Sequence, residues 1–436
     1  MVDFRAYINP SGVKGDALNC PDAVRKGLKG FALEREIIGA GKRPKFLRSQ
    51  KVFKSIVPDP KNAHDPNDPT KPQAFYTDKF PVQSFLWGDY GASPGTSYRF
   101  RILPMFGTPG ALTTDPKDEI KLEITTEKEW EPGETHGVWF NRGAIASQKF
   151  SEEFGNKPPQ NINDPENKEV QRVARSMPRL HQRDQAGRCA ARRGLRVHLC
   201  ADPQCVQSVD RQGIDVPIVY HDTADSGETN EGPMRAAGLS INDQKITYRR
   251  SKTKIPHNKF IVRLKGGTDP VEVWTGSTNF TPSGFFGQTN VGHRVADAET
   301  AQQYFAFWEV VKTDPELKDA RAALAALTPN PAEAIEEKSV VRLFSPRAKV
   351  EMLGWYGRRM LDAANSVWFT AAFGVSKDLI EPIAKMRNQM RFVLMEKPAP
   401  EDQKKRLTAK TTPKKASKKT SKKKTGKAAK KKALRR

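Results

Sequence analysis

Two residues with chemistry to offer, His257 and Lys259, stand two apart at the start of the apolar run IPHNKFIVRL. On an extended strand, side chains two apart point to the same face, so one imidazole would lie beside one fixed cation. Imidazole is a nucleophile, and a neighbouring ammonium group stabilises the negative charge that builds on oxygens around the attacked atom. The spacing therefore favours nucleophilic attack on an anionic ester.

A second strand, VEVW, is predicted next, and it leads into the turn Gly-Ser-Thr-Asn at residues 276–279. The hydroxyl of Ser277 and the amide of Asn279 can bond the oxygens of an anion. The four groups together suit a phosphodiester, in which His257 attacks phosphorus while Lys259 and Asn279 hold the non-bridging oxygens. Ser277 is expected to bind the substrate and to support the turn.

The pattern H-x-K followed by G-S-x-N resembles the phospholipase D superfamily, whose members cut phosphodiesters through a phosphohistidine intermediate. The resemblance implies a phosphodiesterase without metal or cofactor, on an α/β lobe over residues 156–330 with a mixed sheet flanked by helices. The superfamily usually places an aspartate five residues after the lysine. That position is Leu264 here, and the nearest acid is Asp269 in an inserted turn, so the group that fixes the tautomer of the imidazole stays open. The alternative is that His257 and Lys259 are surface residues beside a glycine-rich hairpin.

Neighbouring strands offer further polar side chains. In related lobes the strand that ends here at His293 can carry a residue to the site, so Asn290 and His293 are candidate substrate-binding residues. His221 ends an apolar strand, residues 214–221, of the kind that lies beside the H-x-K strand in this superfamily. It either faces the site or is a hydrogen-bonded histidine of the core or rim. Pro217 in that strand donates no ladder bond, which favours an edge or a bulge.

A helix is predicted over residues 298–312, because Asp297 is a good N-cap and apolar side chains recur on one face. The residues of that face are Ala301, Tyr304, Phe305, Trp308 and Val311. They are expected to pack the core of the lobe. The text GETNEGPM, which precedes the motif, is predicted to be a hydrophilic loop.

Residues 338–398 resemble the opening half of a second phospholipase D repeat. Alternating helices and strands are predicted there, over residues 355–364, 366–373, 379–386 and 391–395. No second H-x-K or G-S-x-N follows, and the sequence holds no histidine after His293. Since this superfamily normally pairs two H-x-K lobes across one active site, one chain supplies half of the pair, and a homodimer is the expected remedy.

The first part of the chain is predicted to be separate from the lobe. Residues 1–72 are interpreted as an N-terminal segment and linker with a helix over residues 21–36, and residues 73–155 as a small antiparallel β-sandwich. Alternating apolar residues predict its strands, around Phe85 and Trp87, Tyr98 to Ile102, Ile120 to Ile124, and Val138 and Phe140. The stretch SYRFRILPMFG weakly resembles a strand of a fibronectin type III domain. An amphipathic helix is predicted over residues 143–154.

Residues 171–196 contain eight arginines and no lysine, although lysine dominates elsewhere. Cys189 lies in this stretch and His198, Cys200 and Cys205 come after it, without the paired C-x-x-C spacing of a zinc site, so no metal is expected there. A local change of reading frame would produce the same jump in composition as adaptation of this segment.

The positive charge is concentrated at one end of the chain. Residues 401–436 hold seventeen Lys and Arg against Glu401 and Asp402, a net charge of +15, so the other 400 residues carry +9 of the total of +24. The tail, residues 399–436, has too few apolar residues to fold and is predicted to be disordered. It is expected to bind polyanions without sequence preference, either an anionic membrane surface or nucleic acid, or else to keep the protein soluble.

With 37% hydrophobic residues, most of the 436-residue chain is expected to be globular. No secretory signal or membrane span is readable, so the predicted location is cytoplasmic or peripheral at the membrane surface, with signal-independent export as the alternative. Phe280, Phe285 and Phe286 favour hydrolysis of phospholipid head groups, or transfer of phosphatidyl groups, unless they are ordinary core residues. A nuclease of the same chemistry, or a degenerate member that only binds polyanions, is the alternative.

Overall fold

The structure is a computed structural model with a mixed α/β fold. It describes residues 3–9, 12–19, 27–49, 51–60, 62–84, 86–89, 91–141, 196–199, 216–222, 227–236, 238–254, 256–280, 284, 287–364, 366–371, 374–385 and 390–395. The chain divides into two compact units, and each is described by itself. The first comprises residues 1–329 with 342–346, and the second comprises residues 330–341 with 347–436.

A five-stranded antiparallel sheet is built around the long strand β8 (Ser97–Thr108). Its other strands are β3 (Gly30–Ile37), β4 (Lys45–Phe46), β9 (Ala111–Thr113) and β10 (Ile120–Thr125), the last preceded by the short helix η1 (Pro116–Asp118). Tyr98, Phe100 and Ile102 of β8 are each at most 2% exposed, because alternate residues of a strand share one face. The strands predicted at these residues and at Ile120 to Ile124 are therefore present.

The helix predicted over residues 21–36 is wrong where the structure describes that stretch. Residues 30–37 form β3, which pairs with β8 along its whole length. Phe31 and Leu33 are buried in one cluster with Ile102. Residues two apart share a face on a strand and not on a helix, so this apolar spacing suits the sheet. The sheet thus includes residues that the sequence assigns to the N-terminal segment.

A second sheet joins β1 (Asp3–Asn9), β2 (Gly12–Asn19) and β7 (Leu86–Asp89). Trp87 of β7 packs edge-on against Phe100 of β8, with 5.8 Å between the ring centroids. The two sheets thus share an apolar contact, while the sandwich and its likeness to a fibronectin type III domain stay predictions. A short hairpin, β5 (His64–Asp65) with β6 (Asp68–Pro72), lies in the predicted linker.

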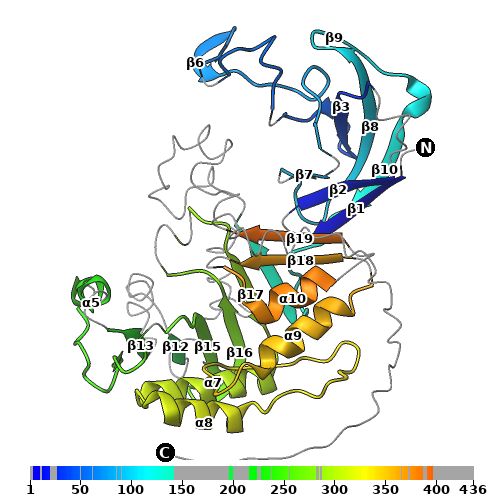
Figure 1. The fold of residues 1–436 in the computed structure, drawn as a ribbon. Helices are drawn as coiled ribbons and strands as arrows, with labels where there is room; N and C mark the ends of the chain where they lie inside the picture. Colours follow the sequence, from blue (N-terminus) through cyan, green and yellow to red (C-terminus); the bar gives the residue numbers. More distant parts are fainter. Residues whose placement is uncertain are drawn as a thin grey trace, which may run out of the picture. The chain divides into compact units, whose positions relative to one another are not determined.

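The sheet that positions the motifs has seven strands in the order β11-β17-β16-β15-β12-β13-β14 (Figure 1). These are β11 (His136–Phe140), β12 (Arg196–Leu199), β13 (Ile218–His221), β14 (Thr247–Arg250), β15 (Phe260–Lys265), β16 (Asp269–Gly276) and β17 (Val291–Val295). β13 runs parallel to β12 and to β14, and the other neighbours are antiparallel. This is the mixed sheet that the sequence predicts for the lobe.

Four expectations about this part of the chain are wrong. The strand at residues 136–140 belongs to it and not to the sandwich, because β11 pairs with β17. The strand that ends at His221, β13, does not lie beside β15. Strand β12 lies between them and pairs with each. Pro217 comes just before β13, where it removes no ladder bond. The text GETNEGPM is not a loop, since it lies in the helix α5 (Gly227–Ala236), which buries Met234.

Helix α7 (Ala298–Lys312) begins at the predicted cap, where Asp297 accepts a hydrogen bond from the Thr300 backbone N–H at 2.7 Å. It packs on the seven-stranded sheet, with α8 (Leu317–Leu327) beside it. The core between helix and sheet includes Phe260, Val262, Leu264, Val273, Val295, Ala301, Phe307, Trp308 and Val311. Burial of apolar surface at about 25 cal/mol per Å² holds α7 against these strands. The apolar face predicted for α7 therefore packs the core.

The second unit follows the predicted order of helix, strand, helix and strand. Its elements are α9 (Glu351–Leu361), β18 (Ser366–Ala371), α10 (Lys377–Lys385) and β19 (Met390–Met395). The two strands pair in parallel, and Ala371, Leu379 and Ile380 lie in their common core.

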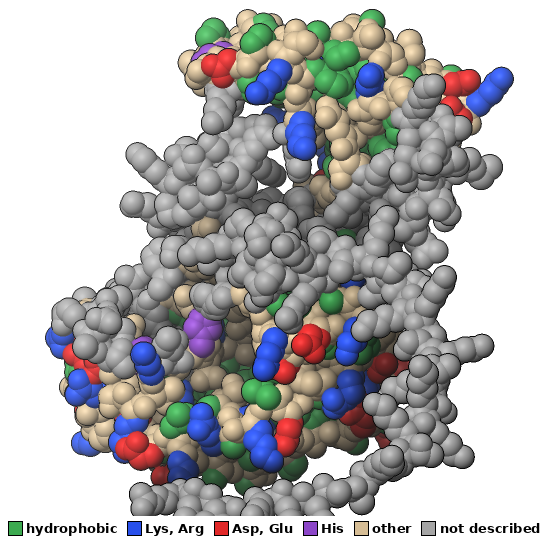
Figure 2. Space-filling model, in the orientation of Figure 1, with side chains coloured by type: hydrophobic (Ala, Val, Ile, Leu, Met, Phe, Trp, Pro, Cys, Tyr) green, Lys and Arg blue, Asp and Glu red, His purple; other side chains and the backbone are tan. Residues whose placement is uncertain are grey.

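The predictions for residues 143–154, for Cys189, Cys200 and Cys205, for residues 171–195, and for the lysine-rich tail concern residues outside the described ones. Within the described ranges, no helix has the length and apolar character needed to cross a bilayer. On the face drawn in Figure 2, Lys and Arg side chains of the described residues are interspersed with Asp and Glu. The described residues on this face therefore do not form one uninterrupted basic surface.

Candidate active site

The two motif halves meet at one end of a hairpin. β15 and β16 are antiparallel, and Phe260 at the start of β15 lies opposite Thr275 near the end of β16. His257 and Lys259 come just before Phe260, and the Gly-Ser-Thr-Asn turn begins just after Thr275. The pairing therefore brings both halves to the same edge of the sheet.

Backbone contacts with β17 shape the turn. A Cβ at Gly276 would lie 2.1 Å from the carbonyl oxygen of Val291, so only glycine fits there. The Ser277 N–H donates to that oxygen at 3.1 Å, and the Val291 N–H donates to Ser277 Oγ at 3.1 Å. The Thr278 hydroxyl also donates to the Val291 oxygen at 3.1 Å. These bonds fix the turn, whose last residue, Asn279, is exposed.

The H-x-K pair combines an exposed imidazole with a buried cation. Lys259 is 8% exposed, and its Nζ donates to the carbonyl oxygen of His257 at 2.8 Å. Partial burial of the His257 ring, followed by the charge of Lys259, lowers the pKa of His257 below its ordinary value of 6.5. At neutral pH the ring is therefore uncharged and has a nitrogen lone pair with which it can attack phosphorus.

Sequence reasoning missed Arg250, which ends β14 and is 2% exposed. Its Nη1 donates to Asn258 Oδ1 at 3.2 Å, and its Nη2 lies 3.4 Å from Thr253 Oγ1. Asn258 stands between the two H-x-K residues, so Arg250 positions that segment. No sequence motif includes this arginine. It can position the H-x-K segment only because the fold brings the end of β14 beside that segment.

A second link joins α7 to the motif through Thr275. The Thr275 hydroxyl donates to the carbonyl oxygen of Lys259 at 3.0 Å, and Tyr304 of α7 hydrogen-bonds Thr275. The Tyr304 ring packs against Phe260 at 5.2 Å between centroids, and burial raises the pKa of its hydroxyl. Tyr304 is thus a core residue, as predicted, that also steadies the backbone at Lys259.

Neither acid position considered from the sequence serves the imidazole. Leu264, at the usual aspartate position, is 1% exposed and packs in the core under α7. In the strand register Asp269 lies opposite Lys265, at the turn end of the hairpin, whereas the motif lies at the other end. The carboxylate expected from the superfamily is therefore not replaced by Asp269.

Of the two further candidates on β17 and the segment before it, the structure brings Asn290 to the motif. Its Oδ1 accepts a hydrogen bond from Ser277 Oγ at 3.1 Å. His293 contacts a different partner, since its Nε2 lies 3.1 Å from Nδ1 of His136 in β11. Burial, followed by the charge of His136, lowers the pKa of His293.

His221 lies near the H-x-K segment. It is half-buried at the end of β13 and stands opposite Arg250 of β14 in the parallel pairing. Burial, followed by the positive charge of Arg250, lowers the pKa of His221. Arg250 also hydrogen-bonds Asn258, so His221 lies in the surroundings of the motif, and any role in the site stays a prediction.

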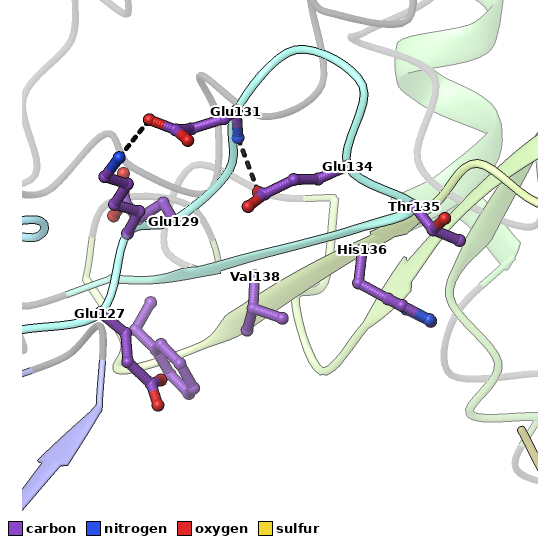
Figure 3. Close-up of a pocket in the computed structure, with 9 residues that line it drawn as sticks. Glu127, Glu129, Glu131, Glu134, Thr135, His136 and Val138 are labelled. Atoms are coloured by element: carbon purple, nitrogen blue, oxygen red, sulfur yellow. Dashed lines mark hydrogen bonds and ion pairs between the residues drawn. The ribbon is translucent and has the colours of Figure 1, made fainter. Parts of the chain in front are cut away.

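An open cavity of about 870 Å³ lies beside His136, along β11 and the loop before it. Figure 3 shows its glutamates, Glu127, Glu129, Glu131 and Glu134. Lys128 pairs with Glu131, and the Glu131 N–H donates to Glu134 at 2.7 Å. Four carboxylates against one ammonium repel a phosphodiester, so this cavity does not suit an anionic substrate. Among the residues that the structure describes, no three His, Cys, Asp or Glu side chains are grouped as metal ligands.

No known family model matches this sequence, and no curated protein matches it. Among solved structures, it is similar to Nuc from Salmonella typhimurium, a phospholipase D family member, with 18% identity, covering 28% of this chain and 80% of that chain, at a TM-score of 0.21. It is similar to NucT from Helicobacter pylori, with 16% identity over 34% and 91% of the two chains and a TM-score of 0.23. It is also similar to phosphatidylserine synthase from Haemophilus influenzae, with 12% identity over 52% and 60% and a TM-score of 0.35. Such low values leave the functional argument to the residues themselves.

Proposed function

We propose that this chain is a phosphodiesterase of the phospholipase D type that cuts its substrate through a phosphohistidine at His257. The observation that carries the proposal is the β15–β16 hairpin, which sets His257 and Lys259 at the same sheet edge as Ser277 and Asn279. An uncharged imidazole, a fixed cation and an amide at one edge are the groups that attack on a phosphodiester needs.

The reaction has two steps. First, a nitrogen of the His257 imidazole attacks phosphorus, a P–N bond forms, and the P–O bond to the leaving alcohol breaks as its oxygen takes a proton from an acid. Then water gives a proton to the conjugate base of that acid and attacks phosphorus, the P–N bond breaks, and the imidazole is released. Lys259 and Asn279 hold the non-bridging oxygens through both steps, with Ser277 and Asn290 as further substrate contacts.

The leaving-group acid comes from a second copy of the chain in this proposal. The sequence has no histidine after His293, and His293 itself is bonded to His136. A two-fold axis would present the His257 of the other copy to the leaving oxygen. The working enzyme would therefore be a homodimer with two equivalent histidines.

The proposed substrate is a phospholipid head-group diester at an anionic membrane surface. The support is the basic tail, whose net charge of +15 attracts the protein to such a surface. If an alcohol replaces water in the second step, the phosphatidyl group is transferred instead. Phe280 does not support a lipid substrate, because it is buried and not part of a lipid-facing rim. It is 4% exposed and packs against Trp274, with 5.5 Å between the ring centroids. Phe285 and Phe286 lie outside the described residues.

That burial leaves nucleic acid as the second candidate, since the same groups accept any phosphodiester. The deciding experiment gives the purified protein phosphatidylcholine vesicles and single-stranded DNA in parallel, and measures free choline and DNA cleavage. Choline release alone supports the lipid, and DNA cleavage alone supports the nuclease.

A variant without residues 404–436 should bind anionic vesicles more weakly and turn over a short soluble diester as fast as the full chain. If the folded protein released no choline and cleaved no DNA, the proposed activity would be contradicted.

A further inference from the structure

A second cavity, of about 390 Å³, lies away from the motif halves. It is bounded by the loop before β14 and β14 itself, by the turn after β15, and by the second half of α7. Its size falls within the range of small-molecule sites, about 300–1,000 Å³. None of its lining residues belongs to the H-x-K segment or to the Gly-Ser-Thr-Asn turn.

Aromatic rings form part of its wall. Tyr248 and Phe305 are half-buried and line the cavity, whereas Trp308 is 1% exposed and packs against both rings. Tyr248 meets Trp308 edge-on at 5.6 Å between centroids, and Phe305 lies parallel to Trp308 at 6.4 Å. The Tyr248 hydroxyl donates to the carbonyl oxygen of Lys245 at 3.0 Å, which fixes the ring further. A planar ligand ring stacks well on fixed rings of this kind.

Two lysines stand at the same wall. Lys245 is exposed, and the Nζ of Lys312 lies 4.9 Å from the ring centroid of Trp308 and 5.6 Å from that of Tyr248. Lys312 pairs with Glu309 at 2.5 Å, and Glu309 is the one carboxylate among the described residues that line the cavity. Two cations against one anion attract an anionic ligand, which must compete with Glu309 for Lys312.

We propose that this cavity binds a nucleotide, with the base against Tyr248 and Phe305 and the phosphate between Lys245 and Lys312. Ring surface beside two ammonium groups matches a planar base joined to a phosphate, whereas an acyl chain would not use the lysines and a bare anion would not use the rings. The nucleotide is either free or one residue of a single strand, because both present the same chemistry. The cavity shares no residue with the motif, so a nucleotide binds here whether or not His257 is catalytic.

The test uses the full chain with His257→Ala, so that no strand is cut. Adenosine 5′-monophosphate, adenosine and inorganic phosphate are titrated by calorimetry, and a labelled deoxyadenosine strand of about ten residues by fluorescence anisotropy. The monophosphate should bind at least about tenfold more tightly than adenosine or phosphate alone, because only it uses both rings and lysines. The double variant Lys245→Ala/Lys312→Ala should weaken its binding at least about tenfold, and Glu309→Gln should tighten it.

Lys265→Ala is the matched control, since Lys265 is an exposed lysine at the end of β15, near the turn that bounds the cavity, and does not itself line it. Circular dichroism checks that each variant folds. The basic tail binds the strand equally in all variants, so only the difference between variants reports the cavity. If the strand binds more tightly than the monophosphate, and the double variant loses that extra affinity, the bound nucleotide is one residue of a strand. Otherwise the site binds a free nucleotide. Equal monophosphate affinity in the parent and the double variant, or an equal loss with Lys265→Ala, would overturn the proposal.

Discussion

Lys259 Nζ donates a hydrogen bond to the carbonyl oxygen of His257 at 2.8 Å, so the cation of the pair is folded back onto the backbone of its own histidine. The bond holds the positive charge near the imidazole, and this nearness is one cause of the lowered pKa of His257. Because Thr275 also bonds the Lys259 carbonyl, the geometry of the pair is tied to the neighbouring strand.

The first prediction concerns the pKa of His257. Lys259→Met removes the cation, so the pKa should rise, although burial, the larger cause, still holds it below 6.5. Lys259→Arg keeps the charge and should leave the pKa low. NMR titration of the His257 ring measures both variants, and an unchanged pKa in Lys259→Met would exclude the coupling. Since one His257 must be uncharged to attack and that of the other copy must be protonated to act as the acid, wild-type turnover should fall both as the pH drops below that lowered pKa and as it rises well above it.

Gly276→Ala should destabilise the protein by about 1–3 kcal/mol, because the added Cβ meets the Val291 carbonyl oxygen and forces β16 and β17 apart. Gly266→Ala is the control, since its φ of +65° carries backbone strain but no atom lies within 4 Å of the added Cβ. Urea denaturation gives the free energy of unfolding of each. Equal losses at the two positions would mean that the close approach of Val291 is unimportant.

Asn279→Ala should lower turnover about 100- to 1000-fold, the effect of losing one preorganised donor to a charged transition state, about 2.7–4 kcal/mol. Asn279 is exposed, so folding should be unaffected. Asn62→Ala, at another exposed amide, is the control and should keep wild-type rates. A loss of less than about fivefold would remove Asn279 from the site.

Activity should scale with dimerisation. Mixing wild-type protein with excess His257→Ala protein should depress activity below simple dilution, since a mixed dimer has only one of the two histidines. Analytical ultracentrifugation of the same samples measures the dimer. Activity proportional to the wild-type protein alone, from a sedimenting monomer, would point to an acid within the lobe.

Local signals in the sequence predicted the parts of the site that depend on neighbouring residues. Asp297 and the apolar face behind it mark α7, and the hairpin joining the H-x-K and Gly-Ser-Thr-Asn segments involves adjacent strands. Non-local pairings decided the rest. β3 is a strand because it pairs with β8, more than sixty residues later in the chain. Arg250 positions Asn258 only once β14 has joined the sheet edge.

The polar composition of residues 227–234 led to a wrong prediction of a loop, because few apolar residues indicate the helix. The sequence of α5, GETNEGPMRA, includes two glycines, two glutamates and a proline, and no apolar period predicts a helix there. Its contacts explain it instead, since Asn230 donates to the His221 carbonyl oxygen at 2.6 Å and the Tyr220 hydroxyl donates to Glu231 at 3.0 Å. These bonds to β13 form only in the folded lobe.

The central claim is that His257 carries the phosphoryl group. The direct measurement mixes the protein with a phosphodiester, quenches the reaction within one turnover, and locates the acid-labile phosphoryl adduct, which keeps the uncleaved ester arm, by mass spectrometry under basic conditions. We expect the phosphate on His257 and none in His257→Ala, together with loss of turnover in that variant. Wild-type turnover in His257→Ala, or phosphate trapped on another residue, would contradict the claim.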